Sequence, residues 1–347
     1  QRTIVQSNTK ISASATENGD GGKVTVWADN RTDFNGTIEA KGGAYGGNGG
    51  FVETSGKETL SATGNVVVSA PAGNAGTWLL DPSNLSILAV LLSTNVNASF
   101  TSTANDAVVA VSSIESVLNS SGNVIITTGA GTQAGNIYVG STITKSAGTS
   151  SSLTLRAAAS IFFVDGADII STAGPLNVTL NSAKDAVPGL TAAQLAFDTT
   201  NFGGVYLNDG NTIKTNGGNI VIGGGSDPST MPAHAIFIST NISRTNVPLT
   251  GVLINNSTLD ATGGGNITIN GQSQQRSLFG KDHDNPSEIN GVFVSNSTIK
   301  TDAAGTIKID GNGGGFQESA FNFGRGVKIQ NSTIEAANGA IDITGKT

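Results

Sequence analysis

The run Lys281-Asp282-His283-Asp284 gathers the most chemically versatile side chains of the sequence. Two carboxylates beside an imidazole could bind a metal ion or exchange protons with a substrate. Consecutive loop residues, however, lack the spacing that places metal ligands on one side of an ion. The sequence also contains neither an EF-hand loop nor a Gly-Gly-x-Gly-x-Asp array that would bind calcium. We interpret the run as a solvated turn and expect no metal and no cofactor.

A second set of charges stands at equivalent positions of four internal repeats. The set comprises Lys214, Asp260, Lys300 and Glu335. Polysaccharide lyases and glycoside hydrolases need two carboxylates, or a carboxylate with lysine or arginine, converging in a groove. Here the sign alternates, so each carboxylate is flanked by lysine and stays ionised. We interpret the set as an exposed salt-bridge column and expect no enzymatic activity, although a polysaccharide-active enzyme remains the alternative.

The repeats that position these charges fill the chain from Gly204 onward. One pattern occupies residues 251–259, 291–299 and 326–334, and a looser copy begins at Gly204. Each copy leads to an Ile-x-Ile segment, of which Ile267-Thr268-Ile269 is the first clear example. The middle residue becomes lysine or aspartate in later copies, so only the flanking isoleucines are kept apolar. This period of two predicts strands with one buried and one solvated face.

Three short strands and three turns in about 20 residues make one coil of a solenoid. Parallel crossovers are almost always right-handed. We therefore predict an all-β chain, a right-handed parallel β-helix of about 14–17 coils with loop insertions. Residues 1–80 and 123–203 read as coils, 204–347 as regular repeats with insertions, and 81–122 as an irregular segment. In that segment an N-cap serine at Ser112 or Ser113, apolar spacing and Gly122 predict one short helix.

The composition restricts the partners of the chain. Its 347 residues include no cysteine and only 12% charged residues, with a net charge of −7. No basic cluster is present, so we expect no binding to nucleic acid. The longest apolar run, residues 85–92, is too short to cross a bilayer, so we expect no membrane insertion. The first residues read as strand without a signal peptide, and no capping segment ends the chain. We therefore expect a piece of a longer fibrous protein.

Insertions of different lengths separate the last repeats, at approximately 223–250, 270–290 and 310–325. All three leave the same corner of the coil and should stack into one lateral face. The candidate partner-binding residues on this face are Arg276, Phe279, Lys281, Asp282, His283, Asp284, Phe316, Glu318, Phe321, Phe323 and Arg325. Irregular loops on a rigid scaffold often carry recognition. The alternative is that these loops only pack their aromatic side chains over the surface of the solenoid.

Three asparagines recur once per repeat, directly before Ser-Thr: Asn256, Asn296 and Asn331. They are formal glycosylation acceptors. We interpret them instead as a structural ladder, because asparagine tolerates a left-handed backbone and can bond to its neighbours above and below.

Other outward residues suggest binding platforms that we consider weaker. Trp27 and Trp78 could stack on sugars, but Trp78 precedes Leu79-Leu80 and is expected to pack in the core or at a corner. With 5% aromatic residues, we expect no aromatic ladder along the rod. A flat threonine face, as in an ice- or mineral-binding solenoid, is interrupted by Lys308 and Asp342. The threonines concerned are Thr25, Thr154, Thr179 and Thr268.

Two stretches carry a family resemblance. They are Gly49-Gly50-Phe51-Val52-Glu53-Thr54-Ser55-Gly56 and Gly76-Thr77-Trp78-Leu79-Leu80-Asp81-Pro82-Ser83-Asn84-Leu85-Ser86-Ile87. The pair resembles a signature of two-partner-secretion exoproteins, the filamentous-haemagglutinin-like and high-molecular-weight adhesins of Gram-negative bacteria. The serine-flanked helix and Gly122-Asn123-Val124-Ile125-Ile126 that follow are also similar to that family. The family's N-terminal secretion domain is missing from this sequence.

The resemblance implies a secreted, surface-tethered filament exported through an outer-membrane secretion partner. We therefore expect an extracellular structural and adhesive filament that serves cell attachment or builds a biofilm matrix. Its expected partners are host or bacterial surface glycans or proteins, with lateral self-association as a further option. A phage tailspike or an autotransporter passenger of the same fold is the remaining alternative, and fold-level reasoning does not separate these.

Overall fold

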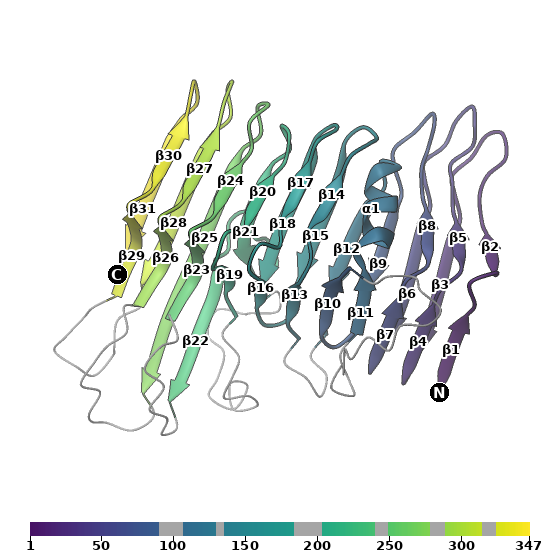
Figure 1. Ribbon diagram of the computed structural model, residues 1–347, viewed down its shortest axis with the longest axis horizontal. Helices are drawn as coiled ribbons and strands as arrows, with labels where there is room; N and C mark the ends of the chain where they lie inside the picture. Colours follow the sequence, from purple (N-terminus) through teal and green to yellow (C-terminus); the bar gives the residue numbers. More distant parts are fainter. Residues whose placement is uncertain (90–106, 130–134, 184–202, 240–248, 278–288, 314–323) are drawn as a thin grey trace.

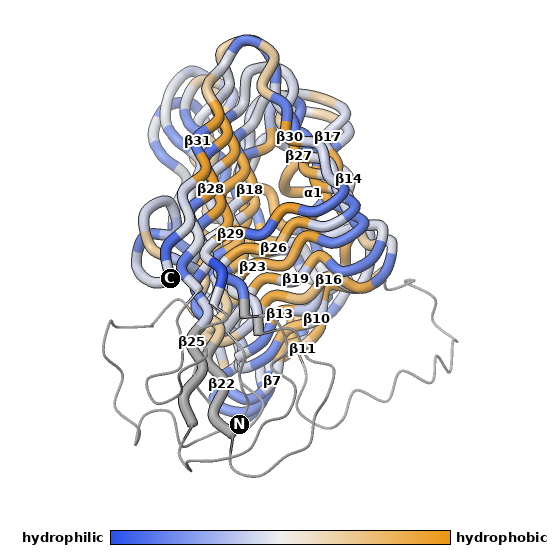
Figure 2. The backbone as a smooth tube through the Cα atoms, turned by 90° about the vertical axis from the view of Figure 1, so that its left-hand side faces the viewer, coloured by the Kyte–Doolittle hydropathy of each residue, from blue (hydrophilic) through white to orange (hydrophobic). Residues whose placement is uncertain are grey.

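The computed structural model describes residues 1–89, 107–129, 135–183, 203–239, 249–277, 289–313 and 324–347. The described strands wind into a parallel β-helix, in which each coil contributes a strand to each of up to three sheets (Figure 1). All of the strand pairings between neighbouring coils of the described residues are parallel. Figure 2 looks along the rod from its C-terminal end and shows the sheets around a shared interior. The predicted parallel β-helix is thus confirmed.

Sheet 1 runs in the order β1 (Arg2–Val5), β4 (Arg31–Phe34), β7 (Thr59–Ala62), β11 (Ala107–Ala110), β10 (Leu85–Leu88), β13 (Ile137–Val139), β16 (Ile161–Phe163), β19 (Val205–Leu207), β23 (Leu249–Asn255), β26 (Ile289–Ser295) and β29 (Gly324–Gln330). Sheet 2 has two parts, β2 (Lys10–Ser12), β5 (Thr37–Glu39) and β8 (Asn65–Val67), then β14 (Ile143–Lys145), β17 (Ile169–Ser171), β20 (Thr212–Lys214), β24 (Thr258–Asp260), β27 (Thr298–Thr301) and β30 (Thr333–Ala336). Sheet 3 contains β3 (Lys23–Ala28), β6 (Phe51–Gly56), β9 (Thr77–Leu80), β12 (Asn123–Thr127), β15 (Ser151–Arg156), β18 (Leu176–Ser182), β21 (Ile220–Gly224), β25 (Ile267–Ser277), β28 (Ile307–Gly313) and β31 (Ile341–Lys346), with β22 (Ala233–Ser239) paired to β25.

The coils are fewer and longer than predicted. The main path of sheet 3 has ten strands in the described residues, hence ten coils rather than 14–17. The prediction divided the chain into uniform short coils. In the structure the equivalent residues Val205, Val252, Val292 and Val327 are 47, 40 and 35 positions apart. Insertions between the coils take up the difference.

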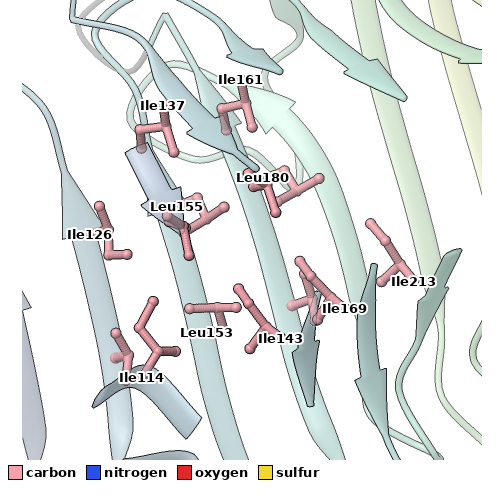
Figure 3. Close-up of a cluster of buried hydrophobic side chains, with 14 of the residues drawn as sticks. Ile114, Ile126, Ile137, Ile143, Leu153, Leu155, Ile161, Ile169, Leu180 and Ile213 are labelled. Carbon is pink, nitrogen blue, oxygen red and sulfur yellow. The ribbon is translucent and has the colours of Figure 1, made fainter. Parts of the chain in front are cut away.

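The interior is a set of stacked aliphatic columns, one inward side chain per coil. In sheet 3 the column Ile126, Leu155, Leu180, Ile222, Ile269 and Ile309 is fully buried. Figure 3 shows part of this column facing Ile137 and Ile161 of sheet 1 and Ile143 and Ile169 of sheet 2. Each such side chain contributes roughly 1.5–3 kcal/mol by leaving water, so the columns stabilise the rod along its length.

The two halves of the sequence signature lie on neighbouring coils and touch each other. Val52 of β6 is the register partner of Trp78 of β9. The indole Nε1 of Trp78 donates a hydrogen bond of 3.0 Å to Oγ1 of Thr54, and Trp78 is fully buried. Trp78 therefore packs in the core, as expected. A Cβ at Gly76 would lie 2.2 Å from the carbonyl oxygen of Gly50, so only glycine allows these coils to meet there.

The stretch 81–122 places one strand out of order. β10 precedes β11 in the chain, yet β11 pairs with β7 while β10 lies between β11 and β13. The turn before β10 secures this arrangement. Oδ1 of Asn84 accepts hydrogen bonds of 2.8 Å from the backbone N–H groups of Gly135 and Asn136, and Oγ of Ser83 donates to the carbonyl of Lys57. The described parts of the segment expected to be irregular, residues 81–89 and 107–122, therefore belong to the solenoid.

The predicted helix is present as α1 (Val111–Asn119), which takes the place of a sheet 2 strand between β8 and β14. Its side chains bridge the two, because Ser116 donates to Asn65 and Glu115 accepts from the N–H of Thr144. The predicted serine N-cap is wrong. Ala110 holds the N-cap position without a side-chain hydrogen bond, while Ser113 is buried. Packing of the apolar face, rather than a cap, stabilises this helix.

Candidate binding surface

The insertions of the last repeats form a two-layered extension of the solenoid, which we term the ledge. It consists of β22 and of residues 249–250, 271–277, 289–290, 311–313 and 324–325, which prolong sheets 1 and 3 beyond the coils. β22 and β25 extend below the other strands in Figure 1. The insertions were expected to be irregular loops, which is wrong for these residues. Apart from β22, they lack alternating apolar side chains, but backbone pairing with neighbouring coils continues the sheets through them.

Glycines let the two layers of the ledge touch. A Cβ at Gly291 would lie 2.3 Å from the backbone nitrogen of Asn312, and one at Gly311 would lie 2.0 Å from the carbonyl oxygen of Gly326. Beyond the glycines, Thr250 and Ser273 are fully buried. Their hydroxyl groups have no hydrogen-bond partner among the described residues. The ledge is thus held by backbone pairing around a polar interior, in contrast to the aliphatic core of the coils.

Two of the predicted partner-binding residues fall on described strands of the ledge. Arg276 lies in β25 opposite Ile238 of β22. Arg325 lies in β29 opposite Asn290 and is exposed. The others lie outside the described residues: Phe279, Lys281, Asp282, His283, Asp284, Phe316, Glu318, Phe321 and Phe323. That these residues contact a partner stays a prediction.

An aromatic stripe runs along the outer side of sheet 1, one coil after another. Tyr138, Phe162 and Tyr206 stack with ring centroids 5.2 Å apart in each pair. Leu253 and Phe293 continue the column, and Nζ of Lys328 lies 4.7 Å from the centroid of Phe293. The expectation that no aromatic ladder exists is wrong. The rings are far apart in sequence, and only the register brings them together.

The exposure of the stripe changes along its length. Tyr138 is 37% exposed, whereas Tyr206 is 8% and Leu253 is 4% exposed. The ring of Tyr206 lies over Gly204, where a Cβ would come within 2.5 Å of the phenol oxygen. Burial raises the pKa of the Tyr206 phenol well above its usual range. Its hydroxyl has no hydrogen-bond partner among the described residues. The middle of the stripe is therefore buried, and its accessible parts are Tyr138 and Phe162 at one end and Phe293 toward the other.

The asparagine positions mark a turn in which the side-chain hydrogen bonds between coils come mainly from the next residue, while the asparagines pair through their backbone. Asn256, Asn296 and Asn331 are exposed and have φ angles of +49°, +49° and +48°. The one side-chain bond between them, from Asn331 to Asn296, is long at 3.5 Å. The following serines form shorter bonds between coils: the N–H of Ser257 donates to Oγ of Ser297 at 3.0 Å, and the N–H of Ser297 donates to Oγ of Ser332 at 3.1 Å. The repeated Asn-Ser-Thr triplet contained this signal, since serine recurs as strictly as asparagine.

The alternating charges align in register as predicted, but the column is not exposed throughout, because Asp260 is buried. Lys214 pairs in register with Asp260, Asp260 with Lys300, and Lys300 with Glu335. Nζ of Lys300 lies 3.4 Å from Oδ2 of Asp260. Burial pushes the pKa of Asp260 upward, but hydrogen bonds from Thr262 and the charge of Lys300 outweigh it, so the pKa lies below its usual value. Asp260 is thus held ionised, which suits a structural ion pair and not a proton donor.

The described residues contain no group of three or more histidine, cysteine, aspartate or glutamate side chains that could hold a metal ion. In the same ranges α1 is the single helix, and its nine residues are too few to cross a membrane. Trp27 lies on the outer side of β3 with 46% of its surface exposed. It stands alone at the N-terminal end of the rod and not in a row of platforms.

A scan against protein-family models finds no match to this sequence, and a search of curated proteins finds none either.

Proposed function

We propose that the chain is a segment of an extracellular adhesive filament, in which the coils form a stiff shaft and the ledge presents the contact residues. The ledge is the observation that supports this proposal best. Three successive coils extend the same two sheets, so the chain segments at their tips start from strands only about 4.8 Å apart. A rigid row of strands that carries these segments suits recognition of a repetitive surface, where many weak contacts act together.

The shaft itself supports the structural half of the proposal. One continuous cluster of buried side chains extends from Val5 in the first coil to Ile309 near the last. Because each coil stabilises its neighbours, a rod of this kind resists local opening and proteolysis.

The exposed end of the aromatic stripe offers a second contact area on the same rod. Faces and edges of Tyr138 and Phe162 are suited to apolar patches of sugars or proteins. We infer host or bacterial surface glycans or proteins as the partners. Export through an outer-membrane secretion partner, and a place on the cell surface or in a biofilm matrix, follow from the resemblance of residues 49–56 and 76–87 alone.

A glycan-array and cell-surface binding assay tests the proposal on the complete 347-residue chain. The test variant replaces residues 278–288, between Ser277 of β25 and Ile289 of β26, with a short Gly-Ser linker. This deletion is smaller than removal of 271–290, which would also cut the paired strands of the ledge. We expect wild-type binding at least about tenfold above that of the variant, with an unchanged cooperative melt. Thr179→Ala, on the outer side of sheet 3, is the matched control and should bind as wild type.

Equal binding by the wild type and the variant would contradict recognition by the ledge. Absence of binding by both would leave the chain as a shaft without adhesive contacts. If the variant also loses its cooperative melt, a Tyr138→Ala and Phe162→Ala variant tests the stripe without touching the ledge.

A further inference from the structure

The outer side of sheet 3 carries one outward residue per coil in a straight column, which we term the flat face. In order along the rod it comprises Thr25, Glu53, Leu79, Ile125, Thr154, Thr179, Val221, Thr268, Lys308 and Asp342. The six central residues, from Leu79 to Thr268, are uncharged, and all six are half-buried by their neighbours. They form a level strip of β-branched and aliphatic side chains, with sheet 3 at the left of Figure 2.

Two of the three charges in the column, Glu53 and Lys308, lie at equal distances from its middle, and the third, Asp342, ends the column beside Lys308 and would face the uncharged Thr25 in a two-fold pair. Glu53 is second from one end of the ten positions and Lys308 is second from the other. The midpoint between them falls between Thr154 and Thr179. The salt bridge of Lys308 to Asp310, at 2.8 Å, leaves the lysine 46% exposed, so it stays accessible from outside.

We propose that the flat face docks against the flat face of a second copy of this chain, with the two rods antiparallel. A two-fold axis between Thr154 and Thr179 then places Glu53 of each copy opposite Lys308 of the other. It also places Ile125 opposite Val221 and Leu79 opposite Thr268. A two-fold contact uses the same surface on both copies, so each favourable charge pair occurs twice.

The same charges disfavour the parallel arrangement. In a parallel pair with matching coils, each residue of the column faces its own copy. Glu53 would then face Glu53, and Lys308 would face Lys308. Like charges placed directly opposite are destabilising. The signs at the two ends therefore select the direction of the second rod.

The size of the face predicts a weak contact. Ten coils spaced about 4.8 Å apart span roughly 43 Å, and three outward positions per strand span roughly 14 Å. The resulting area of about 600 Å² per copy is below the roughly 800 Å² of a standard interface. We therefore expect transient association of single chains at high concentration, which would strengthen where many such coils are joined. Neither the ledge residues nor the aromatic stripe lies in this column, so the inference does not depend on the proposed adhesive function.

Sedimentation equilibrium of the complete chain tests the charge pairing, with Glu53→Lys, Lys308→Glu and the double variant. Each single change creates two like-charged contacts and should weaken association about tenfold at low salt. The double variant exchanges the signs and should restore association to near the wild-type level. Single variants that associate like wild type, a double variant that is not restored, or a wild-type chain that stays monomeric at millimolar concentration would each overturn the proposal.

Cysteine cross-linking tests the direction, because the chain has no cysteine of its own. Ile125→Cys and Val221→Cys chains, distinguished by a mass tag, are mixed and oxidised. The antiparallel arrangement predicts disulfides mainly between the two variants. Disulfides mainly within each variant would show a parallel contact and overturn the proposal. Thr258→Cys, on the outer side of sheet 2, is the control and should remain uncross-linked.

Discussion

The outer sides of sheets 1 and 3 differ although their inner sides are alike. Both sheets turn stacked aliphatic columns inward. Outside, sheet 1 carries a stripe whose middle is buried, with Tyr206 8% and Leu253 4% exposed, whereas the six central side chains of the flat face of sheet 3 all remain half-exposed. The same backbone can therefore add a second packed layer on one side and leave a level contact surface on another. Which of the two surfaces forms depends on the type of the outward residue that lies between two inward residues of each strand.

The largest expected effect separates the inner from the outer side of sheet 3. Ile269→Asp places a charge between Ile222 and Ile309 in a fully buried column and should cost more than about 4 kcal/mol of unfolding free energy. Thr268→Asp, one residue away on the flat face, should cost less than about 0.5 kcal/mol. Urea unfolding with hydrogen exchange in β21–β28 measures both. Similar losses would show that the outward side is also part of the core.

The next effect compares the two outer sides directly. Tyr206→Ala removes a buried ring from the stripe and should cost about 3 kcal/mol. Val221→Ala, on the flat face, should cost about 1 kcal/mol or less. Thermal and urea unfolding of the two variants provide the comparison. If Val221→Ala proves the more damaging, the stripe is not a packed layer.

A smaller effect concerns the hydrogen bonds beside the flat face. Oδ1 of Asn266 accepts the N–H of Thr306 at 2.8 Å and its hydroxyl at 2.9 Å. Asn266→Ala should cost about 1 kcal/mol, because the N–H loses its partner. Asn266→Asp keeps the acceptor and serves as the control, which should retain most of the stability near pH 7. If Asn266→Ala and Asn266→Asp lose the same unfolding free energy, the bonds accepted by Oδ1 are not the cause of the loss.

The smallest effect at neutral pH is expected for Tyr206→Phe. The buried hydroxyl has no partner among the described residues, so its removal should change stability by less than about 0.5 kcal/mol. Burial raises the pKa of Tyr206 above that of an unfolded tyrosine, about 10. The contribution of the neutral Tyr206 phenol to the unfolding free energy is therefore fully present below pH 10 and is lost as the pH rises further. Between pH 9 and pH 11 the unfolding free energy should fall less for Tyr206→Phe than for the wild type. An equal fall in the two proteins would contradict a raised pKa of Tyr206 as a cause of the pH dependence.

Much of the fold could be predicted because the signal is local. The alternation in Lys23–Ala28 gives a strand with the observed bounds, whereas the Ile-x-Ile segments locate β25, β28 and β31 but not their ends, which continue past the second isoleucine. The charge column also followed from aligning the repeats. The out-of-order β10 could not be predicted, since the patterns of β10 and β11 fit either place in sheet 1. The choice depends on hydrogen bonds from distant coils, such as those of Asn84.

The surface was harder to predict for the same reason. Tyr138, Phe162 and Tyr206 have no regular spacing, so their stacking depends on the length of each insertion. The buried position of Lys145 could not be predicted from the sequence either. It is fully buried at an inward corner, where its amine donates to the carbonyls of Ala147, Gly148 and Ala173, and burial lowers its pKa. A lysine between strand residues is ordinarily read as solvent-exposed.

Cysteine accessibility tests the contrast between the two outer sides most directly, because the chain contains no cysteine. Leu253→Cys on sheet 1 and Val221→Cys on sheet 3 both replace outward residues, and Ile222→Cys is the buried reference. Maleimide labelling of the native protein should be fast at position 221 and slow at positions 253 and 222. Labelling at position 253 as fast as at 221 would contradict the account, because both outer sides would then be equally open to solvent.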